Sequence, residues 1–160
     1  MSSREAIKTL ILRYAELVDA GDFEALGALL ANATFTGTTS VTGAAAITQN
    51  FTNTVIRYPD GTPRTRHIVT NFFIEVDEPS GTATSRSTFT AYQALPDFPL
   101  QPIAVGHYDD TFTRTTTWHF TTRQVTIDLP GTLTHHIKSG PTHQSSASSS
   151  TPANGSQASR

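Results

Sequence analysis

The 160-residue sequence contains no cysteine. Disulfide scaffolds, thiolate metal sites and cysteine nucleophiles are therefore excluded together. Clusters of basic residues are missing too, since eleven Lys and Arg stand against thirteen Asp and Glu, for a net charge of −2. Proteins that follow a nucleic-acid backbone carry clustered positive charge, so nucleic acid is not an expected partner.

The sequence also lacks long apolar runs. No stretch is apolar enough to cross a bilayer, and the opening MSSREAIKTL has no signal-peptide core. We therefore expect a cytoplasmic protein with no membrane partner. GxSxG, P-loop and GxGxxG motifs are absent, which leaves nucleophile-elbow and nucleotide-binding functions without support.

Composition divides the chain in two. Residues 139–160 contain no large apolar side chain. Such a segment cannot bury enough surface to offset the entropy of ordering it, so we predict a disordered, Ser-rich tail there. Residues 1–138 are expected to form a single domain.

The first part of this domain has helical spacing. Apolar residues recur every three or four positions, and Ser2 with Glu5 forms a capping box before them. Gly21 is expected to end the first helix and Asp22 to cap a second one. A third helix is predicted over residues 44–54.

The second part is rich in Thr, Val, Ile, Phe and Tyr, which is typical of strands. Long strands are predicted over residues 64–78, 82–94, 103–115 and 117–129, and a short one over 34–38. Three prolines predict a loop over residues 95–102. Helices grouped before an antiparallel sheet indicate an α+β fold, in which a curved sheet closed by three helices would enclose a cavity.

His67 lies near the start of the first long strand. If Val69 and Phe73 mark the concave face, alternation places His67 on that face. A histidine inside a cavity suits proton transfer, because its pKa lies near neutrality. Such a base needs a carboxylate to hold its tautomer and to stabilise its cationic form.

Asp19, at the end of the first helix, is a candidate for that carboxylate. The helix macrodipole disfavours a negative charge there, and the helical wheel places Asp19 off the apolar stripe. The wheel is least reliable at a helix end. From the residues alone, a solvent-facing Asp19 and a partner of His67 both stay open.

The remaining histidines show no metal-binding pattern such as HxH or HExxH, so no metal is expected. His135 and His136 are adjacent and border the tail, which predicts surface positions for both. His107 and His119 lie on predicted strands, where alternation allows either face.

Three segments together resemble the SnoaL-like branch of the nuclear transport factor 2-like superfamily. They are IKTLILRYAELVDAGDFEALGALLANATFTG, RHIVTN and YDDTFTRTTTWHFTTRQVTI. The pattern is similar to those of bile-acid 7α-dehydratase, γ-hexachlorocyclohexane dehydrochlorinase and, more distantly, scytalone dehydratase. The resemblance covers residues 4–138 and rests on the order and spacing of short motifs. It implies a cone-shaped α+β barrel.

In these enzymes an aspartate ending the first helix and a histidine in an H-x-x-T-N sequence form a catalytic dyad without a cofactor. The resemblance gives these roles to Asp19 and His67. It also implies substrate-binding roles for Tyr14, Tyr108, Arg123 and Thr88, the arginine assisting a leaving group.

Alternatives stay open for several of these residues. His107 and Tyr108 are neighbours on one strand, so only one of them can face the cavity, and we expect Tyr108 inward. Tyr14 could equally be a core residue, and Arg123 could be an outward residue paired with a carboxylate.

The resemblance predicts a cofactor-independent lyase that removes water from a small, mostly apolar oxygenated molecule. Polyketide cyclisation, ketosteroid-type isomerisation and simple ligand binding remain alternatives on the same scaffold. The small subunit of a ring-hydroxylating dioxygenase is a further one, which would work beside a metal-bearing partner. Relatives associate through the convex face of the sheet, so a homo-oligomer, a dimer or trimer, is expected.

Overall fold

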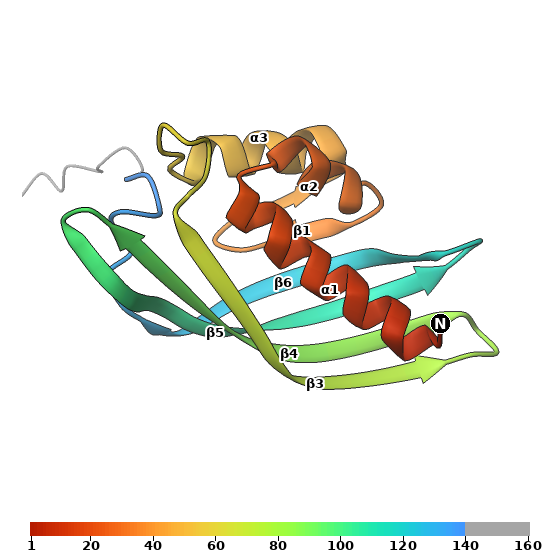
Figure 1. The fold of residues 1–160 in the computed structure, drawn as a ribbon. Coiled ribbons are helices and arrows are strands. Elements are labelled where there is room, and N and C mark those ends of the chain that lie inside the picture. The colour runs from red at the N-terminus through yellow and green to blue at the C-terminus, as the bar shows by residue number, and fades with distance from the viewer. Residues whose placement is uncertain (140–160) are drawn as a thin grey trace, which may run out of the picture.

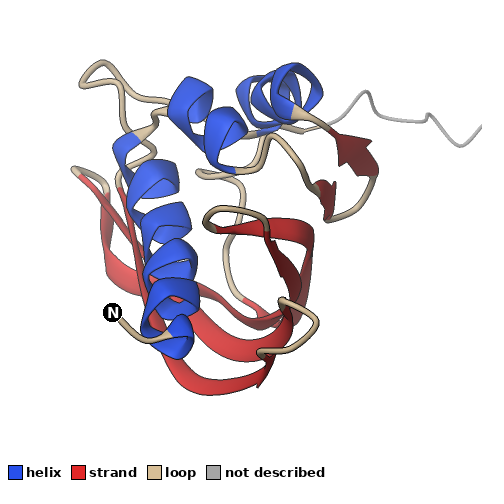
Figure 2. Cartoon of the chain, turned by 90° about the vertical axis from the view of Figure 1, so that its right-hand side faces the viewer, coloured by secondary structure: helices blue, strands red, loops and turns tan. Residues whose placement is uncertain are grey.

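A long helix lies diagonally across the inner face of a curved sheet, and two shorter helices cover one end of that face (Figures 1 and 2). The structure, a computed structural model, describes residues 1–139, so the tail predicted over 139–160 lies outside them except for Ser139. The helices are α1 (Ser3–Ala20), α2 (Phe23–Leu29) and α3 (Ala44–Thr54). The strands are β1 (Thr34–Thr36), β2 (Ser40–Thr42), β3 (Thr65–Asp77), β4 (Thr82–Leu95), β5 (Phe98–Arg114) and β6 (Trp118–Pro130).

The ends of α1 confirm the sequence prediction. The Ser2 hydroxyl accepts the Glu5 backbone N–H, and the Glu5 carboxylate accepts the Ser2 N–H, which completes the capping box. Gly21 ends the helix in the left-handed conformation, with φ 69°. A side chain at Gly21 would collide with the carbonyl oxygen of Gly61, so this turn requires glycine. The turn sets where α1 stops relative to β3.

The six strands form one mixed sheet in the order β2-β1-β6-β5-β4-β3. The meander from β3 to β6 is antiparallel, as predicted, whereas β1 pairs with β6 in parallel. The expected barrel is not closed within residues 1–139, because β2 and β3 are the two edge strands of the sheet there. The hairpin strand β2 was not predicted.

The loop predicted over residues 95–102 is wrong for most of its length. The chain turns at Pro96 and Asp97, and β5 already begins at Phe98. The prolines are tolerated because β6 pairs with β5 only from Ala104 onward, so this part of β5 lies at a sheet edge. The register with β4 also shifts twice here, which relaxes the demand for ladder hydrogen bonds.

A β-bulge in β3 changes which residues of the strand face inward. The pairing with β4 shifts between Thr70 and Phe73, and Asn71 has φ 53°. Val69 therefore packs toward the helices as expected, while Phe73 points outward and is 70% exposed. The prediction that Phe73 shares the inner face with His67 is wrong, since the one extra residue of the bulge reverses the alternation.

The C-terminal segment, residues 133–138, returns to the connection between α3 and β3. Val55 forms a bridge with Ile137, and Ile56 N–H donates to the carbonyl of His136 at 2.8 Å. Lys138 N–H donates to the carbonyl of Thr54 at 2.8 Å. The segment thus closes the end of the sheet beside α3 (Figure 1). No helix within residues 1–139 combines the length and apolar character needed to span a membrane.

Candidate active site

Asp19 and His67 meet where the last turn of α1 crosses the start of β3. The Asp19 Oδ1 lies 2.6 Å from His67 Nδ1, and Oδ2 accepts the His67 backbone N–H at 2.8 Å. The Thr65 hydroxyl donates to Oδ1 at 2.8 Å. The two side chains are only 12% and 9% exposed. Although Asp19 lies off the apolar stripe of α1, it does not face solvent, because β3 covers that side of the last turn.

This geometry determines the tautomer of His67. A carboxylate only accepts hydrogen bonds, so the Nδ1 beside Asp19 carries the proton. The other ring nitrogen, Nε2, then holds a free lone pair on the side of the ring away from Asp19. Within residues 1–139 no side chain or backbone group bonds to Nε2. An imidazole held in this way can accept a proton from a bound molecule through Nε2.

A cavity of about 370 Å³ lies between the inner face of the sheet, α3 and the C-terminal segment. His67 forms part of its wall, and most of the wall is apolar. The polar side chains in the lining are Tyr14, Thr38, Thr39, Asn50, Thr54, His67, Tyr108 and His136. A mostly apolar pocket with a few convergent polar groups is typical of small-molecule sites.

Tyr14 and Tyr108 share one side of this cavity. Their rings pack edge to face with centroids 5.6 Å apart, and Tyr108 points inward as expected. Burial raises the pKa of both phenols, so both remain protonated donors at neutral pH. His107, which precedes Tyr108 on β5, lies on the outer face, where its Nδ1 is 2.7 Å from Asp128 Oδ2.

Arg123 lies behind this pair of tyrosines rather than in the cavity wall. It is fully buried, and it makes a bidentate ion pair with Asp110 at 2.9 and 3.0 Å. Its guanidinium lies 4.0 Å from the ring centre of Tyr14 and 3.9 Å from that of Tyr108. Burial alone would lower the pKa of Arg123, but Asp110 and the tyrosines raise it, so the cation persists. The structure gives Arg123 no direct approach to a molecule in the cavity.

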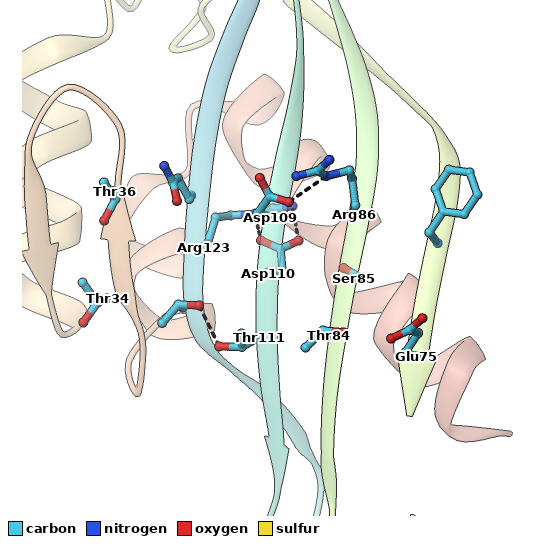
Figure 3. A pocket seen from close by; sticks show the side chains of 13 residues that line it. Thr34, Thr36, Glu75, Thr84, Ser85, Arg86, Asp109, Asp110, Thr111 and Arg123 are labelled. Carbon is cyan, nitrogen blue, oxygen red and sulfur yellow. Dashed lines mark hydrogen bonds and ion pairs between the residues drawn. The ribbon is translucent and has the colours of Figure 1, made fainter. Parts of the chain in front are cut away.

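Asp109 and Asp110 are consecutive on β5 and point to opposite faces of the sheet, each toward an arginine (Figure 3). Asp110 meets Arg123 in the interior, and Asp109 accepts from Arg86 Nε at 2.8 Å on the outer face. Arg86 is 63% exposed, so this second pair lies in water. The outer face around it is hollowed by a shallow groove of about 600 Å³.

Besides the position of Arg123, two more sequence expectations are corrected. Thr88 pairs with His107 and lies on the outer face, since its neighbour Phe89 points into the cavity. His136, expected at the surface, is only 8% exposed and lines the cavity, with its ring centre 6.5 Å from that of His67. Its neighbour His135 is exposed. No sequence periodicity predicts that His136 points inward, because it lies in an irregular segment. Hydrogen bonds to residues far away in the sequence set the path of that segment.

Metal-binding groups do not gather in the described part of the chain. Across residues 1–139, no three His, Asp or Glu side chains come together in a way that could hold an ion. The donors of the cavity are two imidazoles, two phenols, an amide and three hydroxyls. These are groups for hydrogen bonding and proton transfer.

Residues 1–124 match the family profile of the SnoaL-like domain. Comparison with curated proteins finds no match. Several solved structures share the fold. An NTF2-like protein with a cystatin-like fold from Novosphingobium aromaticivorans is 25% identical, with a TM-score of 0.65, and the alignment covers 78% of this chain and 81% of that one.

Two further structures come from the same organism. One, described as an aromatic ring hydroxylase candidate, is 27% identical, with a TM-score of 0.65 and coverage of 83% of this chain and 95% of that one. The other, a scytalone dehydratase candidate, is 22% identical, with a TM-score of 0.62 and coverage of 79% and 84%. At 22% identity, the likeness to the scytalone dehydratase candidate establishes a shared fold and nothing more.

The two aspartates of β5 predict very different effects of substitution. Asp110→Ala leaves a buried guanidinium without its partner and should lower the free energy of unfolding by about 3–5 kcal/mol. Asp109→Ala removes an exposed pair and should cost about 0–1 kcal/mol. Urea unfolding of both variants at pH 7 measures the difference. Equal losses would contradict the assignment of the two side chains to opposite faces.

His136 predicts a pH dependence of stability. Burial, with a smaller contribution from nearby His67, lowers its pKa from 6.5 to about 4. Between about pH 6.5 and 4, His136 is therefore protonated in the unfolded chain but neutral in the folded chain. The free energy of unfolding consequently falls as the pH drops toward 4. Between pH 7 and 4.5 this contributes about 2–3 kcal/mol. Urea unfolding should show that the free energy of unfolding depends less steeply on pH in His136→Phe than in the wild type. Identical pH dependence would contradict the assignment of this effect to His136.

Proposed function

The chain belongs to the SnoaL-like family, and on that basis we propose that it is a cofactor-independent lyase acting in the cytoplasm. Its substrate is a small, mostly apolar molecule that carries a carbonyl and a hydroxyl group, and the reaction removes water. The observation that carries this proposal is the Asp19–His67 pair in the wall of the apolar cavity. A cavity that only stored a ligand would not need a base oriented in this way.

In the proposed reaction, His67 Nε2 takes a proton from a carbon next to the carbonyl. The electron pair of that C–H bond forms a carbon–carbon double bond as the adjacent C–O bond breaks. The proton held on His67 then returns to the departing oxygen, so that water leaves and the neutral imidazole is restored. Asp19, 2.6 Å from Nδ1, stabilises the imidazolium in between.

Tyr14 and Tyr108 supply the hydrogen-bond donors for this chemistry. Their hydroxyls can donate to the carbonyl oxygen, where negative charge develops in the transition state. Arg123 acts from behind them: its positive charge opposes the effect of burial on the pKa of each phenol. This makes both hydroxyls stronger donors than burial alone would allow. We therefore assign Arg123 a positioning role rather than contact with the leaving group.

A second candidate function is favoured by the 27% identity to the aromatic ring hydroxylase candidate. In that case the domain would serve beside a partner that carries the redox centre, and the dyad would not be required for turnover. Isolation with a bound large subunit would support this alternative.

We also propose that the chain forms a dimer or trimer through the outer face of the sheet. Phe73 and Leu129 are 70% and 66% exposed, which is a large apolar area to leave in water. Sedimentation should give a mass two or three times 17.2 kDa, and Phe73→Glu should shift it toward the monomer. A monomeric wild type would contradict the proposal.

Substitution of the dyad tests the proposed lyase. Bicyclic β-hydroxy ketones serve as the substrate panel, and the absorbance of the conjugated enone reports water loss. His67→Ala should lower kcat/KM by about 10²–10⁴-fold, because the general base is removed. Asp19→Asn should cost a similar factor, since an amide can donate to Nδ1 and reverse the tautomer.

His107→Gln provides the matched control, because this histidine lies on the outer face away from the cavity. It should retain the activity of the wild type. Full activity of His67→Ala on a substrate that the wild type converts would eliminate the dyad mechanism.

A further inference from the structure

The cavity contains a second imidazole, His136, that the proposed reaction does not use. It is 8% exposed, and its Nδ1 is buried without a hydrogen-bond partner in residues 1–139. A buried polar atom without a partner lowers stability unless something else satisfies it. The lining around it includes the apolar residues Val55, Leu133 and Ile137. The residues of the described chain leave this nitrogen without a partner.

The position of His136 does not depend on its own side chain. Its backbone carbonyl accepts from Ile56 N–H, and its N–H donates to Leu133 at 3.0 Å. Gln93 reaches the preceding carbonyl, that of His135, at 3.1 Å. Backbone bonds thus hold the segment in place, and the fold presents whatever side chain stands at position 136 to the cavity.

His136 also stands opposite the catalytic base. Its ring centre is 6.5 Å from that of His67, and both rings line the same cavity. Because burial lowers its pKa to about 4, His136 is neutral at physiological pH. A neutral imidazole offers one N–H donor and one acceptor nitrogen, and it adds no positive charge beside His67 when that base becomes protonated.

We propose that His136 is a substrate-binding residue that hydrogen-bonds an oxygen substituent of the substrate on the side of the cavity facing His67. A hydroxyl or carbonyl oxygen placed there would bond to Nε2, the ring nitrogen that, unlike Nδ1, is not enclosed by protein atoms and has no hydrogen-bond partner in residues 1–139. The C-terminal segment lies beyond residues 1–124, the part that matches the SnoaL-like profile. The inference rests on the proposed function, since it concerns the same cavity.

Binding of three probes tests the role of His136 without turnover. The probes are 1-tetralone, 1-tetralol and tetralin, which share one bicyclic skeleton and differ in a carbonyl, a hydroxyl or no oxygen. The wild type should bind the two oxygenated probes more tightly than tetralin. His136→Phe should lose about 5–10-fold in affinity for 1-tetralone and 1-tetralol, the equivalent of one hydrogen bond, and change little toward tetralin. Isothermal titration calorimetry measures all affinities.

Two further variants control the experiment. His107→Phe makes the same replacement on the outer face and should keep the wild-type preference for oxygen. His136→Gln retains a donor and an acceptor and should recover part of the preference that His136→Phe loses. In ¹⁵N-histidine spectra, 1-tetralone should shift the ring nitrogens of His136, and tetralin should not.

The proposal is overturned if His136→Phe keeps the preference for the oxygenated probes. Failure of the wild type to bind either oxygenated probe, or equal affinity for all three, would overturn it as well. These outcomes are separate from the test of the dyad, because binding requires no proton transfer. An active His67→Ala enzyme together with a lost preference in His136→Phe would reject the lyase mechanism and leave the binding role of His136 intact.

Discussion

The hydrogen bonds that Asp19 accepts are the constraint on which the site depends. One carboxylate receives the Thr65 hydroxyl, the His67 backbone N–H and the His67 ring, so it joins the end of α1 to the start of β3. The backbone bond holds the strand against the helix, and the ring bond orients the imidazole. Structure and proposed chemistry therefore share one group: without Asp19, His67 would lose both its tautomer and a fixed position in the cavity wall.

A second polar layer lies behind the cavity wall. The ion pair of Arg123 and Asp110 is buried, and such a pair is costly to desolvate unless hydrogen bonds and neighbouring groups compensate. Here the bidentate geometry and the faces of Tyr14 and Tyr108 provide that compensation. In return, the cation acts on both phenols from outside the cavity. Electrostatic influence thus reaches the site without placing a charged side chain in contact with an apolar substrate.

Much of the fold follows from local physical chemistry. Ser2, Glu5 and Gly21 delimit α1 through capping and a left-handed turn, which depend only on neighbouring residues. Alternation correctly places Tyr108 and its neighbour His107 on opposite faces of the sheet. Alternation fails at Phe73, because a bulge changes the count of residues. The proline-rich stretch fails as a loop prediction for a related reason: whether proline is tolerated depends on which strands lie beside it.

The sequence by itself determined the three helices, the four long strands, their order and the candidate His67, since these depend on period, capping and turn residues. Family resemblance supplied Asp19 as its partner. Tertiary structure alone decided that Asp19 is covered, because the covering strand lies more than forty positions along the chain. The tertiary structure also places Thr88 and Arg123 outside the cavity wall, in which the resemblance had expected them, and places His136 in it. The last of these rests on backbone bonds between distant segments, which no local pattern in the sequence encodes.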